Sequence, residues 1–210
     1  RKDKAAASEA AGQGLLIGIV LGGILSALGL TFGEHALRAL GTEPEVIEAA
    51  LGYMDIVFTF SLVRLIMYIG GGILRASGDT RTPLIATGIM NCFNVVGDWV
   101  LIFGIGPFPR MGIEGAALAT GLSYIIGASI LLVKLFRYRD GFYIYGRHLY
   151  RINGALIRSI IRIALPNVGE QVVLQGAYWA FLWIVTGLGT TALAAHFMAI
   201  RIEMFSFMPV

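Results

Sequence analysis

The sequence predicts an all-α, polytopic membrane protein, and three observations lead to that fold class. Hydrophobic residues make up 57% of the chain and charged residues only 14%, with a mean hydropathy of +0.77. A soluble domain has about a quarter of its residues charged. The apolar residues gather in six runs, each near the roughly 20 residues that a helix needs to cross a bilayer. Most charged residues fall between these runs.

The first two runs cover residues 12–32 and 46–74. A break is expected between them at 33–44, where charged residues and a proline interrupt the apolar pattern. The second run is longer than one membrane thickness requires, so we expect it to cross as a single tilted helix.

The third and fourth runs cover residues 83–104 and 112–135. A tight turn at 77–82, in the segment RASGDTRTP, precedes the third run, because glycine, aspartate and proline there favour a turn before a new helix. A loop at 106–112, rich in proline and glycine, separates the third run from the fourth.

A basic, aromatic connector at 134–162 precedes the fifth run, 164–187, and the sixth, 190–210. The second half of the connector is expected to lie at the membrane interface as a helix with Arg151, Arg158 and Arg162 on one face. For the first half of the connector, an ordinary solvated loop is an open alternative to an interfacial segment. The last two runs are separated only by GLGT, so they form an antiparallel helical hairpin.

The distribution of lysine and arginine predicts the orientation of the chain. If the N-terminus is cytoplasmic, twelve basic residues fall in cytoplasmic segments and only two, Arg38 and Arg110, fall on the opposite side. Loops rich in basic residues stay in the cytoplasm. The twelve are Arg1, Lys2, Lys4, Arg75, Arg81, Lys134, Arg137, Arg139, Arg147, Arg151, Arg158 and Arg162.

The third run carries three polar residues on one helical face, Asn91, Asn94 and Asp98, spaced i, i+3 and i+7. A carboxylate in the middle of a membrane costs about 2.5 to 3.5 kcal/mol on insertion scales, so Asp98 is expected to face a protein interior or a watery path. The alternative is that these residues only join helices through hydrogen bonds, each worth about 0.6 to 2 kcal/mol.

Further polar or aromatic residues lie within the predicted membrane segments. Arg64 is too far along its helix to pair with Asp55, so it reaches either toward Asp98 or into a polar cavity. Glu170 and Trp183 are further cavity candidates, although aromatic residues in membrane helices more often pack or anchor at the interface.

The sequence lacks the motifs of an integral-membrane enzyme, and no catalytic residue is predicted. It contains neither HExxH nor GxSxG nor a P-loop, and its three histidines lie on different segments. A single cysteine excludes an internal disulfide framework and a multi-cysteine metal site. A purely structural membrane subunit stays open as a third class.

Four sequence blocks resemble the multidrug and toxic compound extrusion (MATE) family of secondary transporters. In chain order they are LRASGDTRTPLIATGIMNCFNVVGDWVLIFGIG, MGIEGAALATGLSY, IALPNVGEQ and GLGTTALAAHFMAIRI. The resemblance implies a drug/H+ or drug/Na+ antiporter of the inner or plasma membrane, built from twelve helices in two lobes. Since the chain begins with Arg1 and ends within an apolar run, we expect a fragment of a longer protein. The resemblance implies that this fragment holds family helices three to eight.

The resemblance also implies a domain organisation and a set of partners. Residues 1–136 would be the last four helices of the N-lobe, 137–163 the cytoplasmic linker and 164–210 the first two helices of the C-lobe. The expected partners are membrane lipids, a small organic substrate, a coupling cation and the remaining six helices, with no nucleic acid and no cofactor. The alternative within the same superfamily is a lipid-linked oligosaccharide flippase, which would line its lobe with basic residues such as Arg64.

In related transporters an Asn-x-x-x-Asp pair and a threonine on the next helix contribute to a cation site in the N-lobe. The resemblance assigns these roles to Asn94, Asp98 and Thr120, which would hold either a proton or Na+. Another branch of the family uses a glutamate of the seventh helix, but there it lies further beyond the proline than Glu170 lies beyond Pro166.

Overall fold

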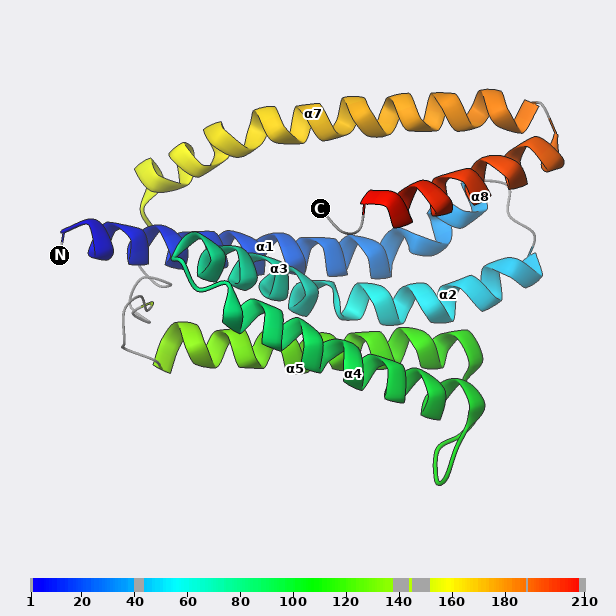
Figure 1. The fold of residues 1–210 in the computed structure, drawn as a ribbon, viewed down its shortest axis with the longest axis horizontal. Helices are drawn as coiled ribbons and strands as arrows, with labels where there is room; N and C mark the ends of the chain where they lie inside the picture. The colour runs from blue at the N-terminus through cyan, green and yellow to red at the C-terminus, as the bar shows by residue number, and fades with distance from the viewer. Residues whose placement is uncertain (1, 40–43, 138–143, 145–151, 188, 208–210) are drawn as a thin grey trace. The chain divides into compact units, whose positions relative to one another are not determined.

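The computed structural model describes residues 2–39, 44–137, 144, 152–187 and 189–207. All regular structure within these residues is α-helical, which confirms the predicted all-α class. The chain divides into two compact units, residues 1–157 and 158–210. The first unit contains helices α1 to α5, and the second contains most of α7 and all of α8 (Figure 1).

Three helices of the first unit are long and apolar enough to cross a membrane: Ala6–Ala39 within α1, α4 (Arg81–Phe103) and α5 (Gly112–Arg137). A fourth crossing is formed if the bent pair α2 (Pro44–Thr59) and α3 (Ser61–Ala76) counts as one span. These are the first four predicted runs, so the described part of the chain supports a polytopic membrane protein.

Helix α1 (Lys2–Ala39) continues through the segment where a break was expected from residue 33. Its sequence there, GEHALRA, consists mostly of good helix formers, and one glycine costs a helix only about 1 kcal/mol. Arg38 also forms an ion pair with Glu34 one turn earlier. The rest of the expected break, residues 40–43, lies outside the described residues.

The second run is not one tilted helix, as predicted, but two helices that meet at Phe60 with a bend of 46°. The cause lies on α1, where the hydroxyl of Ser26 donates a 2.6 Å hydrogen bond to the carbonyl of Phe58. The hydroxyl of Ser61 lies 2.8 Å from that of Ser26 and 3.3 Å from the carbonyl of Gly22. Side chains that compete for backbone carbonyls bend a helix.

The predicted turns on both sides of α4 are present. The turn before it contains Gly78 in the left-handed region (φ +92°), and Asp79 accepts a 2.9 Å hydrogen bond from the backbone N–H of Thr82. Gly104 ends the helix with φ +71°. A side chain at Gly104 would also lie 2.6 Å from the backbone nitrogen of Arg110, so only glycine fits this close turn.

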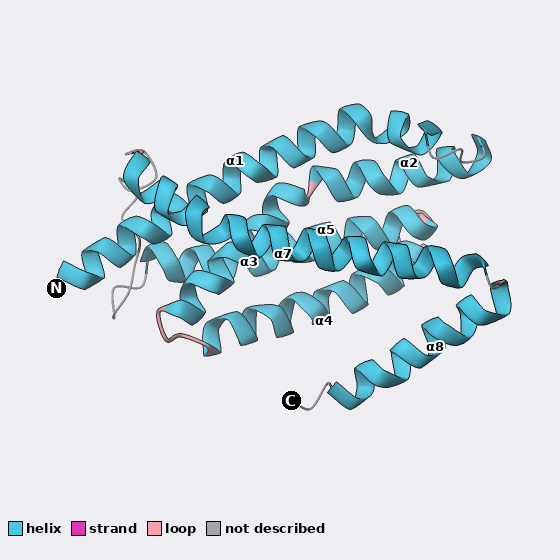
Figure 2. Cartoon of the chain, turned by 90° about the horizontal axis from the view of Figure 1, so that it is seen from above, coloured by secondary structure: helices cyan, strands magenta, loops and turns pink. Residues whose placement is uncertain are grey.

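Helix α5 is the central element of the first unit, because it packs against α2, α3 and α4. Helix α1 covers the other side of α2 and α3, as Figures 1 and 2 show. One cluster of buried apolar residues forms the core of this unit, with members on α1, α3, α4 and α5 and at Ile144. They are Ala11, Leu15, Met67, Leu74, Ala86, Ala128, Leu131, Leu135 and Ile144.

Helix α7 (Gly154–Gly187) begins earlier than the fifth apolar run, so Arg158 and Arg162 lie on its first turns rather than on a separate interfacial helix. Arg151 is outside the described residues. The side-chain oxygen of Asn153 accepts a 3.3 Å hydrogen bond from the N–H of Leu156 and so caps the helix. Its amide nitrogen donates a 2.8 Å hydrogen bond to Glu9 of α1.

Helix α8 (Thr190–Phe207) follows α7 after a tight turn at Gly189, whose φ is +98°. The short connection was predicted from GLGT. The rings of Phe181 and His196 lie 5.0 Å apart, centroid to centroid, near this turn. Neither α7 nor α8 is among the candidate membrane spans that the described residues contain. Helix α7 carries several amide and charged side chains, which lower its hydropathy.

Candidate functional site

Close contact between α4 and α5 determines where the predicted site residues lie. A side chain at Gly97 would be 3.0 Å from the Cβ of Ala119, and one at Gly115 would be 2.7 Å from the carbonyl oxygen of Leu101. Small residues at these positions let the two backbones approach closely. Asn94 and Asp98 of α4 are therefore brought to the level of Thr120 on α5.

The structure brings together the three residues to which the resemblance assigns the cation site. The amide nitrogen of Asn94 donates a 3.1 Å hydrogen bond to the hydroxyl oxygen of Thr120. It also lies 3.5 Å from a carboxylate oxygen of Asp98, at the outer limit of a hydrogen bond. We refer to Asn94, Asp98 and Thr120 as the α4–α5 polar cluster.

The polar cluster offers one carboxylate and two neutral oxygen ligands. Oxygen donors suit a hard cation such as Na+, and a lone carboxylate can instead carry one proton. Within the described residues no group of three or more histidine, cysteine, aspartate or glutamate side chains is placed to hold a metal ion. The cluster is therefore suited to a single positive charge.

Arg64 of α3 lines a cavity that Asp98 does not line. It lines a cavity of about 130 Å³ between α2, α3 and α5, together with Tyr53, Phe60, Thr120 and Tyr124. We call it the Arg64 cavity; Val57, Ala117 and Gly121 complete its lining. The guanidinium carbon of Arg64 lies 6.0 Å from the ring centroid of Tyr124 and 5.8 Å from that of Tyr68.

Asn91 does not join the polar cluster. It lies on α4 one turn before Asn94, is exposed, and has no hydrogen-bond partner among the described residues. Helical spacing puts Asn91 on the same face as Asn94, but it does not bring Asn91 into contact with the polar cluster. The hydrogen bonds of the cluster instead depend on the partner helix α5 and on Thr120.

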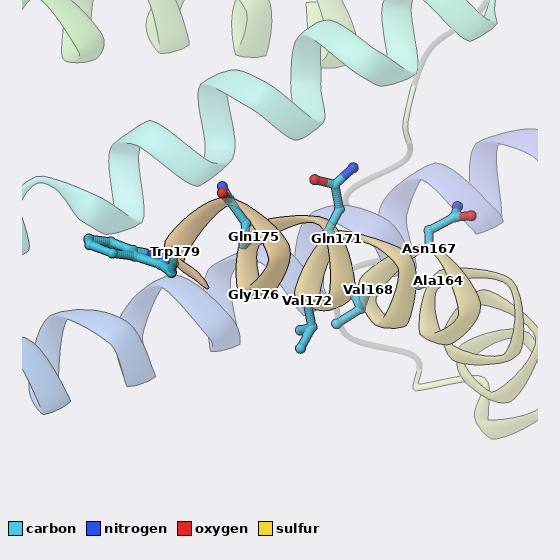
Figure 3. Close-up of a pocket in the computed structure, with 8 residues that line it drawn as sticks. All are labelled: Ala164, Asn167, Val168, Gln171, Val172, Gln175, Gly176 and Trp179. Atoms are coloured by element: carbon cyan, nitrogen blue, oxygen red, sulfur yellow. The ribbon is translucent and has the colours of Figure 1, made fainter. Parts of the chain in front are cut away.

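Glu170 and Trp183 lie on α7, in the second unit, and both are exposed there. Neither lines the large hollow of about 640 Å³ that runs along α7. Figure 3 shows that its polar side chains, Asn167, Gln171 and Gln175, project from the same side of α7. Their i, i+4, i+8 spacing is readable in the sequence and would have identified this amide stripe.

Comparison with known proteins identifies the family of this chain. The MatE family model matches residues 1–100. The "Probable multidrug resistance protein NorM" of Thermotoga maritima is 36% identical over 167 residues, which are 80% of this chain and 36% of the relative. The chain belongs to the MATE family. MATE proteins are multi-pass membrane transporters, which agrees with the prediction of a transport protein rather than an enzyme.

Two further matches extend the comparison. The FAD transporter of Shewanella oneidensis is 36% identical over 116 residues, which are 55% of this chain and 26% of that protein. A crystal structure of MATE in complex with MaD3S superimposes with a TM-score of 0.88 at 26% identity, covering 99% of this chain and 46% of the other. The MATE chain described here thus spans less than half the length of the relatives it matches.

Proposed function

We propose that this chain is part of a cation-coupled antiporter that exports drugs or other organic, often cationic, compounds across the cytoplasmic membrane. The single observation that carries the proposal is the contact of Asn94 with both Thr120 and Asp98 in a helix pair that is apolar enough to cross a membrane. The relatives named for multidrug resistance support the substrate class.

In the proposed mechanism Asp98 carries the coupling ion, either H+ or Na+, and is exposed to each side of the membrane in turn. Asn94 and Thr120 are neutral partners that ligate a bare cation or accept a hydrogen bond from the protonated acid. Export is coupled because the loaded and unloaded forms of Asp98 favour different conformations of the transporter.

One coupled ion provides enough free energy for useful export. Moving one charge through about 150 mV supplies roughly 3.5 kcal/mol. At about 1.4 kcal/mol per tenfold change, this supports a substrate gradient of a few hundredfold. The polar cluster, with its single carboxylate, therefore meets the energetic need without a second acidic site.

The proposed orientation places the N-terminus of this chain in the cytoplasm, since basic residues are concentrated on that side. The turn at 77–80 would then be cytoplasmic and the loop at 104–111 external. In a cysteine-free version of the full-length protein, an impermeant thiol reagent added to intact cells should label Phe108→Cys and not Ser77→Cys. The reverse labelling pattern would contradict the orientation.

Arg64 and the relative named as an FAD transporter favour a second candidate, transport of larger anionic compounds. A lipid-linked oligosaccharide flippase would move cargo of this class. Within the described residues, however, the Arg64 cavity contains one basic residue, whereas a phosphate-bearing lipid head group would be held by several. Drug export is therefore the function that we place first.

The deciding experiment uses the full-length protein in sealed vesicles that contain a pH-sensitive dye. Adding a cationic drug to energised vesicles should release protons or, in Na+ medium, move Na+ in exchange for drug. Vesicles without protein serve as the control. Drug movement that continues unchanged without either ion gradient would reject coupling, and movement only of a lipid-linked sugar would support the flippase.

A further inference from the structure

An open groove of about 540 Å³ lies between the first turn of α4 and the C-terminal part of α5. Its lining residues are Thr82, Ser129, Ile130, Val133 and Lys134, and we call it the Lys134 groove. None of these five residues belongs to the α4–α5 polar cluster or lines the Arg64 cavity. Since α4 and α5 are both candidate membrane spans, the groove lies where two spans end at one membrane surface.

The Lys134 groove extends from the membrane surface into the apolar layer. Lys134 lies three residues before the end of α5, and Ser129 lies five residues deeper, about 7.5 Å further along the helix. Ile130 and Val133 form the apolar wall between these levels, and Val133 is exposed. A lysine keeps its ammonium group at the interface while its stem lies along apolar surface. The groove therefore has a charged outer end and an apolar inner part.

The outer end of the groove presents one positive and one negative charge. The Nζ atom of Lys134 lies 3.6 Å from a carboxylate oxygen of Asp79, which belongs to the turn before α4. The two side chains are 36% and 25% exposed, so both charges are accessible to a ligand in the groove. Because the two charges cancel, a ligand with one anionic and one cationic group matches this end better than a simple anion.

Hydrogen bonding at the outer end determines which cationic group fits. The hydroxyl of Thr82 donates a 2.7 Å hydrogen bond to Asp79, so toward the groove its oxygen can only accept. An ammonium group that carries N–H bonds can donate to this oxygen and to the Asp79 carboxylate. A trimethylammonium group has no N–H to donate. The ammonium group of Lys134 can in turn donate to a phosphate oxygen.

The inner part of the groove suits a hydrocarbon chain. The hydroxyl of Ser129 donates a 2.7 Å hydrogen bond to the carbonyl of Ile125 on its own helix, so it offers no proton to a ligand. Ile130 and Val133 supply apolar surface beside it. The volume of about 540 Å³ falls within the roughly 300 to 1,000 Å³ of small-molecule sites, which leaves room for a head group and the first part of a chain.

We propose that the Lys134 groove binds a phosphatidylethanolamine molecule of the adjoining membrane leaflet. Lys134 binds the phosphate, Thr82 and Asp79 accept hydrogen bonds from the ethanolammonium group, and an acyl chain lies along Ile130 and Val133. In the orientation proposed above, this leaflet is the cytoplasmic one. Lipid binding at the groove does not depend on the proposed drug export, so either can fail without the other.

Competition between two lipids that differ only in methylation of the head-group amine tests the proposal. The full-length protein in detergent is mixed with equal amounts of dioleoyl phosphatidylethanolamine and dioleoyl phosphatidylcholine, and bound lipid is measured by native mass spectrometry. Wild type should retain the ethanolamine lipid over the choline lipid by about fivefold or more. Thr82→Val keeps the side-chain shape and the backbone hydrogen bond to Asp79 but removes the hydroxyl, so the preference should fall below about twofold. Thr82→Ser keeps the oxygen and should retain the preference.

Lys134→Gln removes the charge that binds the phosphate of both lipids, so it should weaken both by about tenfold. Arg110→Gln changes an exposed arginine in the loop at the opposite end of α4 and α5, and as the control it should change neither. Soluble phosphoethanolamine lacks acyl chains and should not displace the lipid. Equal retention of the two lipids by wild type, an unchanged preference in Thr82→Val, unchanged binding in Lys134→Gln or displacement by soluble phosphoethanolamine would each overturn the proposal.

Discussion

The amide nitrogen of Asn94 lies 3.1 Å from the hydroxyl oxygen of Thr120, although the two residues belong to different helices. The same hydroxyl donates its only proton to the carbonyl of Ala116, 2.8 Å away on its own helix. Toward Asn94, and toward any cation beside Asp98, the Thr120 oxygen can therefore act only as an acceptor. This arrangement fixes the chemical role that Thr120 can have in the polar cluster.

Thr120→Val tests that role, because valine keeps the shape of threonine and removes the oxygen. We expect the affinity for the coupling cation to fall by about 5- to 30-fold, which corresponds to about 1 to 2 kcal/mol for one lost neutral ligand. Cation affinity is measured from the ion dependence of drug exchange by the full-length protein. Thr120→Ser retains the oxygen and should stay within about twofold of wild type. Equal effects of the two changes would remove the hydroxyl from the site.

Gly115→Ala is expected to destabilise the protein through the contact between α4 and α5. The added methyl group would lie 2.7 Å from the backbone oxygen of Leu101, which cannot move aside as a side chain can. Overpacking of this kind costs about 1 to 3 kcal/mol, more than the roughly 1 kcal/mol that alanine gains in helix propensity. The melting temperature of the full-length protein should therefore fall.

Gly88→Ala is the matched control for this prediction. Gly88 lies on α4, is exposed, and has no atom within 4 Å of the position that a side chain would take. Alanine should leave the melting temperature unchanged or raise it slightly. If Gly115→Ala were as well tolerated as Gly88→Ala, the close packing of α4 on α5 would be wrong.

The sequence predicted the helices well wherever apolar runs ended at strong turn signals. The turn at 77–80, the loop at 104–111 and the turn at Gly189 all lie where glycine, proline and charge interrupt a run. The bend at Phe60 could not be predicted in this way, because it depends on contacts with Ser26 and Gly22 of α1. Hydrogen bonding by Ser26 of α1 depends on tertiary packing and leaves no local signal.

For the candidate site, the sequence identified residues better than it identified contacts. Helical spacing placed Asn91, Asn94 and Asp98 on one face, yet only Asn94 contacts Thr120, and Asp98 is linked to Thr120 through Asn94. The partner of Arg64 was left open between Asp98 and a polar cavity, and the structure places Arg64 in a cavity beside Tyr124. Such pairings depend on the rotation of neighbouring helices, which sequence spacing does not determine.

Asp79 is expected to make the stability of the turn before α4 depend on pH. The hydroxyl and backbone N–H of Thr82 donate hydrogen bonds to the Asp79 carboxylate, and with Lys134 3.6 Å away they lower the pKa of Asp79 below its ordinary value. Because the folded pKa is lowered, the ionised carboxylate stabilises the fold above the unfolded pKa of about 3.9. That stabilisation is lost as the pH falls through the folded value.

Asp79→Ala removes this contribution, so it should destabilise the protein at pH 7 by about 1 kcal/mol, as for a lost helix cap. Melting curves measured down to pH 3 should show the difference from wild type shrinking below about pH 4. Asp79→Asn keeps an oxygen for Thr82 and serves as the control with a smaller loss at pH 7. A difference between Asp79→Ala and wild type that stays constant with pH would show that the charge is unimportant.

Asp98→Asn separates an ion-coupling role for Asp98 from a purely structural one. The substitution keeps the shape of the side chain and removes its charge, and a neutral amide is less costly to place in a membrane than a carboxylate. We expect normal membrane insertion and an unchanged or higher melting temperature, together with loss of gradient-driven efflux. Drug binding should persist, because an ion site can be lost without loss of the drug cavity.

The measurements for Asp98→Asn are efflux and melting temperature of the full-length protein, made side by side. If Asp98 only joins α4 to α5 through Asn94, the variant should lose stability in proportion to its loss of transport. Cys92→Ser is a suitable control, since Cys92 is an exposed residue of the same helix and should affect neither quantity. Full coupled transport by Asp98→Asn at normal stability would exclude Asp98 as the carrier of the coupling ion, and the search would then move to Glu170 in the second unit.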